Sequence, residues 1–292
     1  MRTNERLDQA LRTAKVVDFD STSKFVFFSD VHRGDDSVSD EFTKNQTTFL
    51  HALDYYYENG FTYIEVGDGE DLWEYGDFKV IRLAHAEVYD KMRDFFRDGR
   101  LYIIYGNHNN KLKNKAYVKK NLDHCCNEFN ESCECLYPHI DVLQSILLRD
   151  KENGHSFLVV HGHQGDLFND QLWFVSRFLL HYIWRYFHVI GLHSPTSPAK
   201  VLYKRHRIEA NFEKWIRLRR QAVICGHTHR PRFPRKSRVP YFNTGASTFS
   251  KGITGIEIVD GKIQMIEWRD RANPETGVVE VKRAITKGPR VI

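Results

Sequence analysis

The sequence has few cysteines, little excess charge of either sign and no long uncharged apolar run. Cysteine occurs five times in 292 residues, an odd number, so at least one thiol lacks a partner and a reducing compartment is the better environment. The net charge of +5 weakly favours anionic ligands and does not call for a nucleic acid. Since the first twenty residues are charged throughout and lack the apolar centre of a signal peptide, we expect a cytoplasmic protein.

The most apolar stretch, Leu167 to Ile190, is long enough to cross a bilayer. Asp170, Arg177 and Arg185 fall at intervals along it, and charges in the middle of a segment make membrane insertion unfavourable. We therefore expect no transmembrane segment. The spacing of its apolar residues predicts a helix that is apolar on more than one side.

Four of the cysteines crowd into the segment from Cys125 to Cys135, which His124 and His139 flank. Their spacing matches none of the paired C-x-x-C patterns of structural zinc sites. Reduced thiols on a connecting segment are therefore the preferred interpretation, with a zinc site as the alternative.

The first part of the chain alternates between strand and helix patterns. Short apolar runs predict strands in "KFVFFSD", "FTYIEVGD" and "RLYIIYGNH", and helical spacing predicts helices over Phe42 to Asn59 and Phe78 to Asp98. This alternation indicates an α/β core in which the first three strands are parallel.

The pattern then changes to strands joined by short turns. "SILLRD" and "SFLVVHG" predict a β-pair around a polar turn, and four more strands are predicted in "AVICG", "VPYFNTG", "ITGIEIVD" and "KIQMIEW". We expect two sheets in one domain of residues 1–292. The polar residues 270–292 are expected to form a weakly ordered C-terminal extension.

Five predicted strands end in a glycine-bearing turn with Asp, Asn or His: "SDVHRGD", "VGDGEDLW", "YGNHN", "VVHGHQGD" and "CGHTHRP". Because ligands bind at the carboxyl ends of strands in open α/β sheets, these side chains are expected to converge. The seven donors are Asp30, His32, Asp68, Asn107, His161, His227 and His229. Seven oxygen and imidazole donors without a thiolate are too many for one ion and suit two divalent Mn, Fe, Zn or Co ions.

These motifs, taken in order as D-x-H, GD, GNH, H-G and GHTH, resemble those of the calcineurin-like metallophosphoesterases. The resemblance implies a four-layer αββα sandwich of two mixed β-sheets flanked by helices, with a dinuclear metal centre. It implies that one metal is held by Asp30, His32 and His229 and the other by Asn107, His161 and His227. Asp68 then bridges the two.

The resemblance also implies that His108 is not a ligand but binds a phosphoryl oxygen or protonates the leaving group. A structural histidine that caps the loop is the alternative. The family often follows GNH with an acidic residue, whereas this chain has Asn109, so a carboxylate that orients His108 must come from elsewhere. The candidates for substrate binding are Arg33, Asn109, His163 and Arg230.

The expected activity is hydrolysis of a phosphate ester of a small molecule by metal-activated hydroxide. "GDGEDLWEYGD" and "GHTHRP" also resemble the UDP-diacylglucosamine hydrolases, which makes pyrophosphate hydrolysis the second interpretation. A non-catalytic scaffold and a nuclease are the further alternatives, and no stable nucleic-acid partner is expected.

The segment from Leu167 to Arg220 is predicted to be a helical insertion. The simpler interpretation is that the apolar helix at its start is buried against the helix that follows it. The alternative hypothesis is a cap over the metal site that selects substrates with a hydrophobic group.

Overall fold

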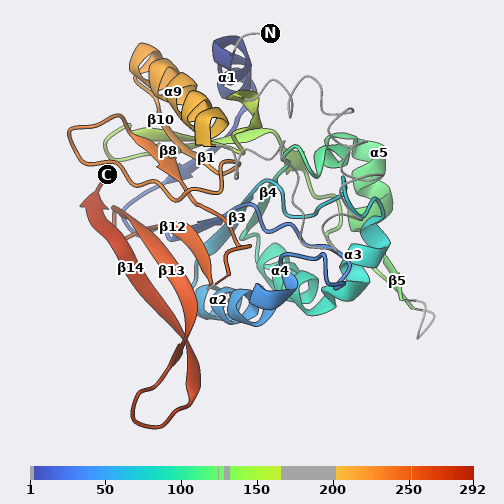
Figure 1. Cartoon of the computed structure of the whole chain (residues 1–292). Helices are drawn as coiled ribbons and strands as arrows, with labels where there is room; N and C mark the ends of the chain where they lie inside the picture. Colours follow the sequence, from blue (N-terminus) through green and yellow to red (C-terminus); the bar gives the residue numbers. More distant parts are fainter. Residues whose placement is uncertain (1–2, 124, 128–131, 166–201, 251) are drawn as a thin grey trace.

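The computed structural model describes residues 3–123, 125–127, 132–165, 202–250 and 252–292. Two β-sheets lie face to face, and helices cover the outer face of each (Figure 1). The result is a four-layer αββα sandwich. The predicted fold class is therefore confirmed.

The larger sheet has seven strands in the order β14-β13-β12-β2-β3-β4-β7. Their bounds are β2 Phe25–Phe28, β3 Thr62–Val66, β4 Leu101–Ile104, β7 Val142–Leu143, β12 Ile253–Val259, β13 Lys262–Ala272 and β14 Val279–Val291. Strands β2, β3 and β4 are parallel, as the alternating pattern predicts, and β12 to β14 are antiparallel.

The smaller sheet has five strands in the order β1-β8-β9-β10-β11. Their bounds are β1 Lys15–Phe19, β8 Ser145–Asp150, β9 Ser156–Val160, β10 Ala222–Cys225 and β11 Tyr241–Asn243. The predicted β-pair is present as the antiparallel hairpin β8–β9, while β9, β10 and β11 are parallel. Both sheets are therefore mixed.

Helices cover both outer faces (Figure 1). Their bounds are α1 Thr3–Thr13, α2 Gln46–Glu58, α3 Phe78–Ala84, α4 Ala86–Arg97, α5 Lys115–Val118 and α9 Leu202–Arg219. The pair α2 and α4 packs on the seven-stranded sheet, and α1 and α9 pack on the five-stranded sheet. The predicted helix over Phe78 to Asp98 is interrupted at His85, whose imidazole bonds to Asp40 and Gln46.

Strand β2 illustrates why the inner strands are continuously apolar. Phe25 and Phe27 pack in the core between the two sheets, whereas Val26 and Phe28 pack in the core under the helices. Successive side chains of a strand point to opposite faces, so a strand in a middle layer buries every residue. All four residues of β2 are buried.

The expectation of a weakly ordered extension over residues 270–292 is wrong. Strand β14 pairs with β13 along its length, and the Arg283 guanidinium bonds to the buried Glu257 carboxylate. The polar residues of β14 hide its strand pattern because its solvent face carries charges. The buried charge of Glu257 requires this partner.

The described part of the predicted insertion is helical. In α9 the buried residues Ile208, Phe212, Trp215 and Ile216 pack on strands of the five-stranded sheet together with Leu7 of α1. Helix α9 therefore belongs to the outer layer of the sandwich. Residues 166–201 lie outside the described residues, and the cap stays a prediction.

The cysteine segment contributes a short antiparallel hairpin, β5 Cys125–Asn127 and β6 Ser132–Glu134. Cys135, which follows β6, is exposed. Among the helices that the structure describes, none combines the length and apolarity needed to span a membrane.

Candidate metal centre

The predicted ligands gather where five strands end. Asp30 and His32 follow β2, Asp68 follows β3, Asn107 follows β4, His161 follows β9, and His227 and His229 follow β10. Three groups have ligand atoms within 4.8 Å of one another, and two of them consist of predicted ligands: Asp30, His32 and His229 form one, and Asp68, His161 and His227 form the other. The third group is His32, Asp71 and His108. The two sheets thus bring together residues that lie up to 199 positions apart, from Asp30 to His229.

In the first group, His229 lies between its partners. Its Nε2 atom is 3.1 Å from Oδ1 of Asp30 and 3.3 Å from Nε2 of His32. Two metal bonds of about 2.1 Å separate neighbouring ligand atoms by about 3.0–3.4 Å, depending on the angle. The spacing therefore fits a shared ion.

In the second group, the orientation of His161 is set by a backbone carbonyl. Its Nδ1–H donates to the carbonyl of Val66 at 2.9 Å, which leaves Nε2 as the ring nitrogen that can bind a metal. That Nε2 atom lies 3.0 Å from Oδ2 of Asp68. Metal-binding histidines are typically oriented by such a bond from the other ring nitrogen.

Asp68 lies between the two groups. Its Oδ2 atom is 3.0 Å from Nε2 of His161 and 3.9 Å from Nε2 of His32, and its Oδ1 atom accepts from the backbone N–H of His108 at 2.8 Å. One carboxylate can therefore serve both positions, which is the arrangement a bridging ligand requires.

Asn107 provides an independent test of fit. Its side chain is 2% exposed, yet neither its oxygen nor its nitrogen has a hydrogen-bond partner among the described residues. A buried amide without partners costs about 1–3 kcal/mol, and a cation bound to its oxygen removes part of that cost. The next residue, His108, donates its backbone N–H to Asp68, so this unpartnered amide belongs to a loop that contacts the second group and fits a second metal.

Five of the seven predicted ligands have a left-handed backbone. The φ angles are 50° for Asp30, 52° for His32, 52° for Asp68, 67° for His227 and 49° for His229. Non-glycine residues adopt this region uncommonly, and such residues cluster at functional sites.

Two motif glycines are required by the closeness of the loops. A Cβ atom on Gly106 would lie 2.1 Å from Oδ1 of Asp68, and one on Gly226 would lie 2.4 Å from Oδ2 of Asp30. Any larger residue would push a carboxylate away from its group. The glycines of GNH and GHTH therefore allow the ligand loops to approach each other closely.

The neighbouring carboxylates favour the charged form of His32 when no cation is bound. Burial disfavours the charge on His32, but Asp71, Asp68 and Asp30 more than offset this and raise its pKa to about 10. Burial likewise opposes ionisation of Asp30, and His229 and His161 lower its pKa to about 2. A metal bound to His32 must displace the proton from the ligand nitrogen, so binding releases that proton to solvent.

The carboxylate that orients His108 is Asp71, which the sequence analysis did not identify. Its Oδ2 atom lies 2.9 Å from Nδ1 of His108 and 3.2 Å from Nδ1 of His32. Burial opposes its ionisation, but His108 and His32 hold its pKa well below the usual range. Its position in "GDGED", three residues after Asp68 in the same loop, is the sequence feature from which it could have been predicted.

Arg33 does not point toward substrate, which corrects the prediction. Its guanidinium is fully buried and binds both oxygens of Glu65 at 2.8 Å and Oε1 of Glu70 at 2.8 Å. The physical reason is the pair of buried carboxylates, which need a cation.

Asn109 is also turned away from the site, contrary to its predicted contact with substrate. It is fully buried, and its amide donates to Oε2 of Glu70 at 2.9 Å, while its oxygen accepts from the backbone N–H of Gly106. The Glu70 carboxylate lies beside residue 109 and would repel a second carboxylate there. This accounts for an amide instead of an acidic residue at position 109.

His163 and Arg230 stay candidates for substrate binding. The His163 ring is 7% exposed and lies 5.6 Å from that of His161. Burial, followed by the charges of His161 and His227, lowers the pKa of His163 well below its ordinary value. Arg230 follows the ligand His229 and lies 3.4 Å from the buried Glu209 of α9.

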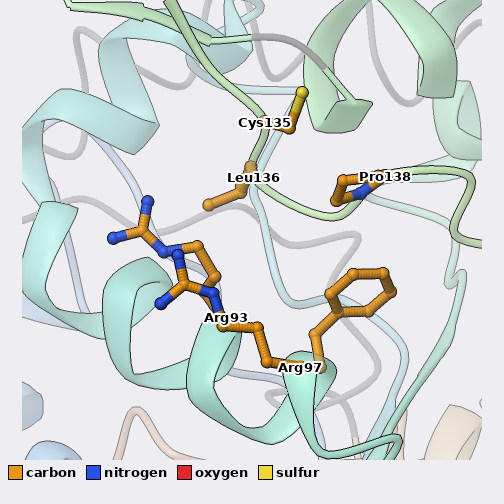
Figure 2. A pocket seen from close by; sticks show the side chains of 6 residues that line it. Arg93, Arg97, Cys135, Leu136 and Pro138 are labelled. Atoms are coloured by element: carbon orange, nitrogen blue, oxygen red, sulfur yellow. The ribbon is translucent and has the colours of Figure 1, made fainter.

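A cavity of about 420 Å³ lies apart from the ligand loops, between α4 and the segment before β7. Figure 2 shows Arg93 and Arg97 of α4 facing Cys135, Leu136 and Pro138 across it. None of the predicted ligands lines this cavity. It plays no part in the site.

No protein-family model matches the sequence, and no curated protein sequence matches it. Among solved structures, the chain is similar to vacuolar protein sorting 29 from Cryptosporidium parvum, with 12% identity, TM-score 0.39, and coverage of 90% of this chain and 96% of that one. It is similar to an archaeal phosphodiesterase, with 14% identity, TM-score 0.36, and coverage of 90% and 99%. It is also similar to a cold-active protein-tyrosine phosphatase of a Shewanella species, with 14% identity, TM-score 0.40, and coverage of 91% and 83%. At these TM-scores the assignment of the fold rests on the two sheets of the chain itself.

Proposed function

We propose that the chain is a dinuclear metal-dependent phosphohydrolase that cleaves a phosphate ester of a small molecule. The observation that carries this proposal is the pair of histidine and aspartate groups that meet at Asp68, with His108 beside them. Such a centre matches the motif order of the metallophosphoesterases described above.

The donor set defines the cofactor that the site would take. Asp30, His32 and His229 would hold one divalent ion, Asn107, His161 and His227 would hold the other, and Asp68 would bridge. When bound, two such ions acidify water and offset charge on phosphoryl oxygens. Imidazole and carboxylate ligands suit Mn, Fe, Zn or Co.

The remaining polar groups would bind and orient the ester. Asp71 accepts from Nδ1 of His108, so Nε2 is the atom that can donate to a phosphoryl oxygen or to the leaving group. Arg230 stands next to the ligand His229, where its guanidinium would bind a second phosphoryl oxygen.

The decisive experiment combines metal analysis with a substrate panel. Purified protein loaded with Mn²⁺ is expected to hold close to two ions per chain and to hydrolyse at least one class among phosphomonoesters, phosphodiesters and pyrophosphate esters. Asp68→Ala is expected to lose both ions. The matched control is Asp150→Ala, another buried aspartate, at the end of β8, whose replacement is expected to keep both ions.

The panel also separates the alternatives. Turnover confined to a nucleoside diphosphate lipid or sugar would support the UDP-diacylglucosamine-type pyrophosphate hydrolase. Two bound metals without turnover of any ester would support a scaffold of the same fold. Protein that cannot be loaded with metal would contradict the proposal itself.

A further inference from the structure

The loop that supplies Asp68 and Asp71 also places a tryptophan against His108. The indole of Trp73 stacks on the His108 imidazole, with ring centroids 4.4 Å apart and an angle of 25° between the ring planes. Trp73 is 1% exposed. Its face therefore covers one side of the imidazole and excludes solvent from it.

Three contacts restrict His108, and each acts in a different direction. Asp71 bonds Nδ1 at 2.9 Å, His32 meets the ring at 84° with centroids 4.6 Å apart, and Trp73 lies against its face. A single hydrogen bond at Nδ1 restrains the ring but still permits it to tilt about the line of that bond. The stack removes this freedom because rotation would lift the imidazole from the indole or drive the two rings together.

Ordinary core packing does not explain why this side chain is an indole. The Nε1–H group of Trp73 is buried and has no hydrogen-bond partner in the described part of the chain. Burying an unpaired donor costs about 1–3 kcal/mol, which leucine or phenylalanine at the same place would avoid. The gain that opposes this cost is a broad aromatic face against the imidazole.

We propose that Trp73 is the positioning residue for His108, holding the plane of its ring so that Nε2 is presented to the leaving-group side of the substrate. Trp73 itself touches no reacting atom in this scheme. The proposal rests on the proposed function, in which His108 acts on a phosphate ester.

The kinetic test uses two esters that differ in their need for a proton donor. Trp73→Leu is expected to keep two metals and a nearly unchanged KM, while kcat for an alkyl phosphate falls about 10- to 100-fold. The p-nitrophenyl ester should lose much less, because its leaving group departs without a proton. Trp73→Phe, which keeps an aromatic face, is expected to recover most of the rate.

The matched control is Trp215→Leu, which removes a fully buried indole from the core between α9 and the five-stranded sheet. It is expected to lower stability and to leave the ratio of the two rates unchanged. Equal losses on both esters in Trp73→Leu, or loss of metal from that variant, would return Trp73 to a structural role. So would a Trp73→Phe variant as slow as Trp73→Leu.

A second readout does not depend on activity. In the wild-type protein, metal-free or loaded with Zn²⁺, NMR should show the His108 ring protons shifted upfield by the indole, unlike those of the exposed His155. In Trp73→Phe the shift should shrink while the His108 signals stay sharp. Unshifted His108 protons in the wild type would overturn the proposal. Normal shifts in a protein that hydrolyses no ester would instead count against the proposed function alone.

Discussion

The two sheets supply different donors and hold their loops with different chemistry. All the oxygen donors, Asp30, Asp68 and Asn107, come from the seven-stranded sheet, whereas the five-stranded sheet supplies imidazoles only. Behind the first set lies a buried guanidinium, Arg33, between two buried carboxylates. Behind the second set lies a neutral amide, Asn243.

Arg33 connects three separate loops of the seven-stranded sheet. It follows β2, its partner Glu70 follows β3, and Glu70 in turn accepts from Asn109 after β4. Glu65 and Glu70 outnumber the one guanidinium, so the network carries excess negative charge next to the ligand loops. Negative charge behind a site stabilises cations bound within it.

Asn243 makes hydrogen bonds to the turn after β10 and to its own loop after β11. Its amide donates to the carbonyl of Gly226 at 2.5 Å and to the hydroxyl of Thr228 at 3.2 Å, and its oxygen accepts from the N–H of Gly245. These bonds fix the turn that carries His227 and His229. Three separate loops are thus held together by a buried ion-pair network around Arg33, whereas the single turn after β10 is held by the hydrogen bonds of one amide.

Replacing Arg33 should have the largest effect on stability. Arg33→Met leaves Glu65 and Glu70 buried without a cation, and we expect the free energy of unfolding to fall by about 3–5 kcal/mol in chemical denaturation. The control is Arg149→Met, which breaks the exposed pair with Asp18 and should cause no measurable loss. A loss no larger than that of the control would mean that the network does not hold the loops.

Asn109→Asp tests the charge balance of the same network. The new carboxylate would face Glu70 instead of donating to it, and we expect a loss of about 3 kcal/mol at pH 7. Burial and Glu70 would raise the pKa of the introduced carboxyl. The destabilisation should therefore be greatest above that pKa and shrink as the pH falls and the group takes up a proton.

Unfolding curves at pH 7 and pH 5 measure this dependence. Asn109→Ala serves as the control, since it removes the amide without adding charge and its loss should not shrink at the lower pH. Equal losses for Asn109→Asp at both values would show that charge is not the cause.

Asn243→Ala should have the smallest effect of the three. It leaves the carbonyl of Gly226 and the N–H of Gly245 without this partner, and we expect a loss of about 1–3 kcal/mol. Metal analysis is expected to show weaker binding of the ions that His227 and His229 are proposed to hold. A loss as large as that of Arg33→Met would remove the contrast between the two sheets.

The sequence alone predicted the two sheets, which the structure confirms, and named the seven candidate ligands at the strand ends. Each motif is local, since an apolar run predicts a buried strand and a glycine-bearing turn at its end carries the donor, as with Asp68 after β3 and His161 after β9. The parallel order of β2, β3 and β4 followed from the same alternation of strands and helices. The roles of the individual ligands stay predictions.

Only the tertiary structure decided where the charged side chains beside the motifs point. Arg33 turns inward because Glu65 and Glu70, from another strand and loop, leave two carboxylates to be paired. Asp71 reaches His108 from a loop 37 positions away. Strand β14 forms although its own pattern is polar, because it pairs with the edge of β13 and its Arg283 binds Glu257 on β12. Burial and counter-charge come from distant parts of the chain, so no local pattern of residues reveals them.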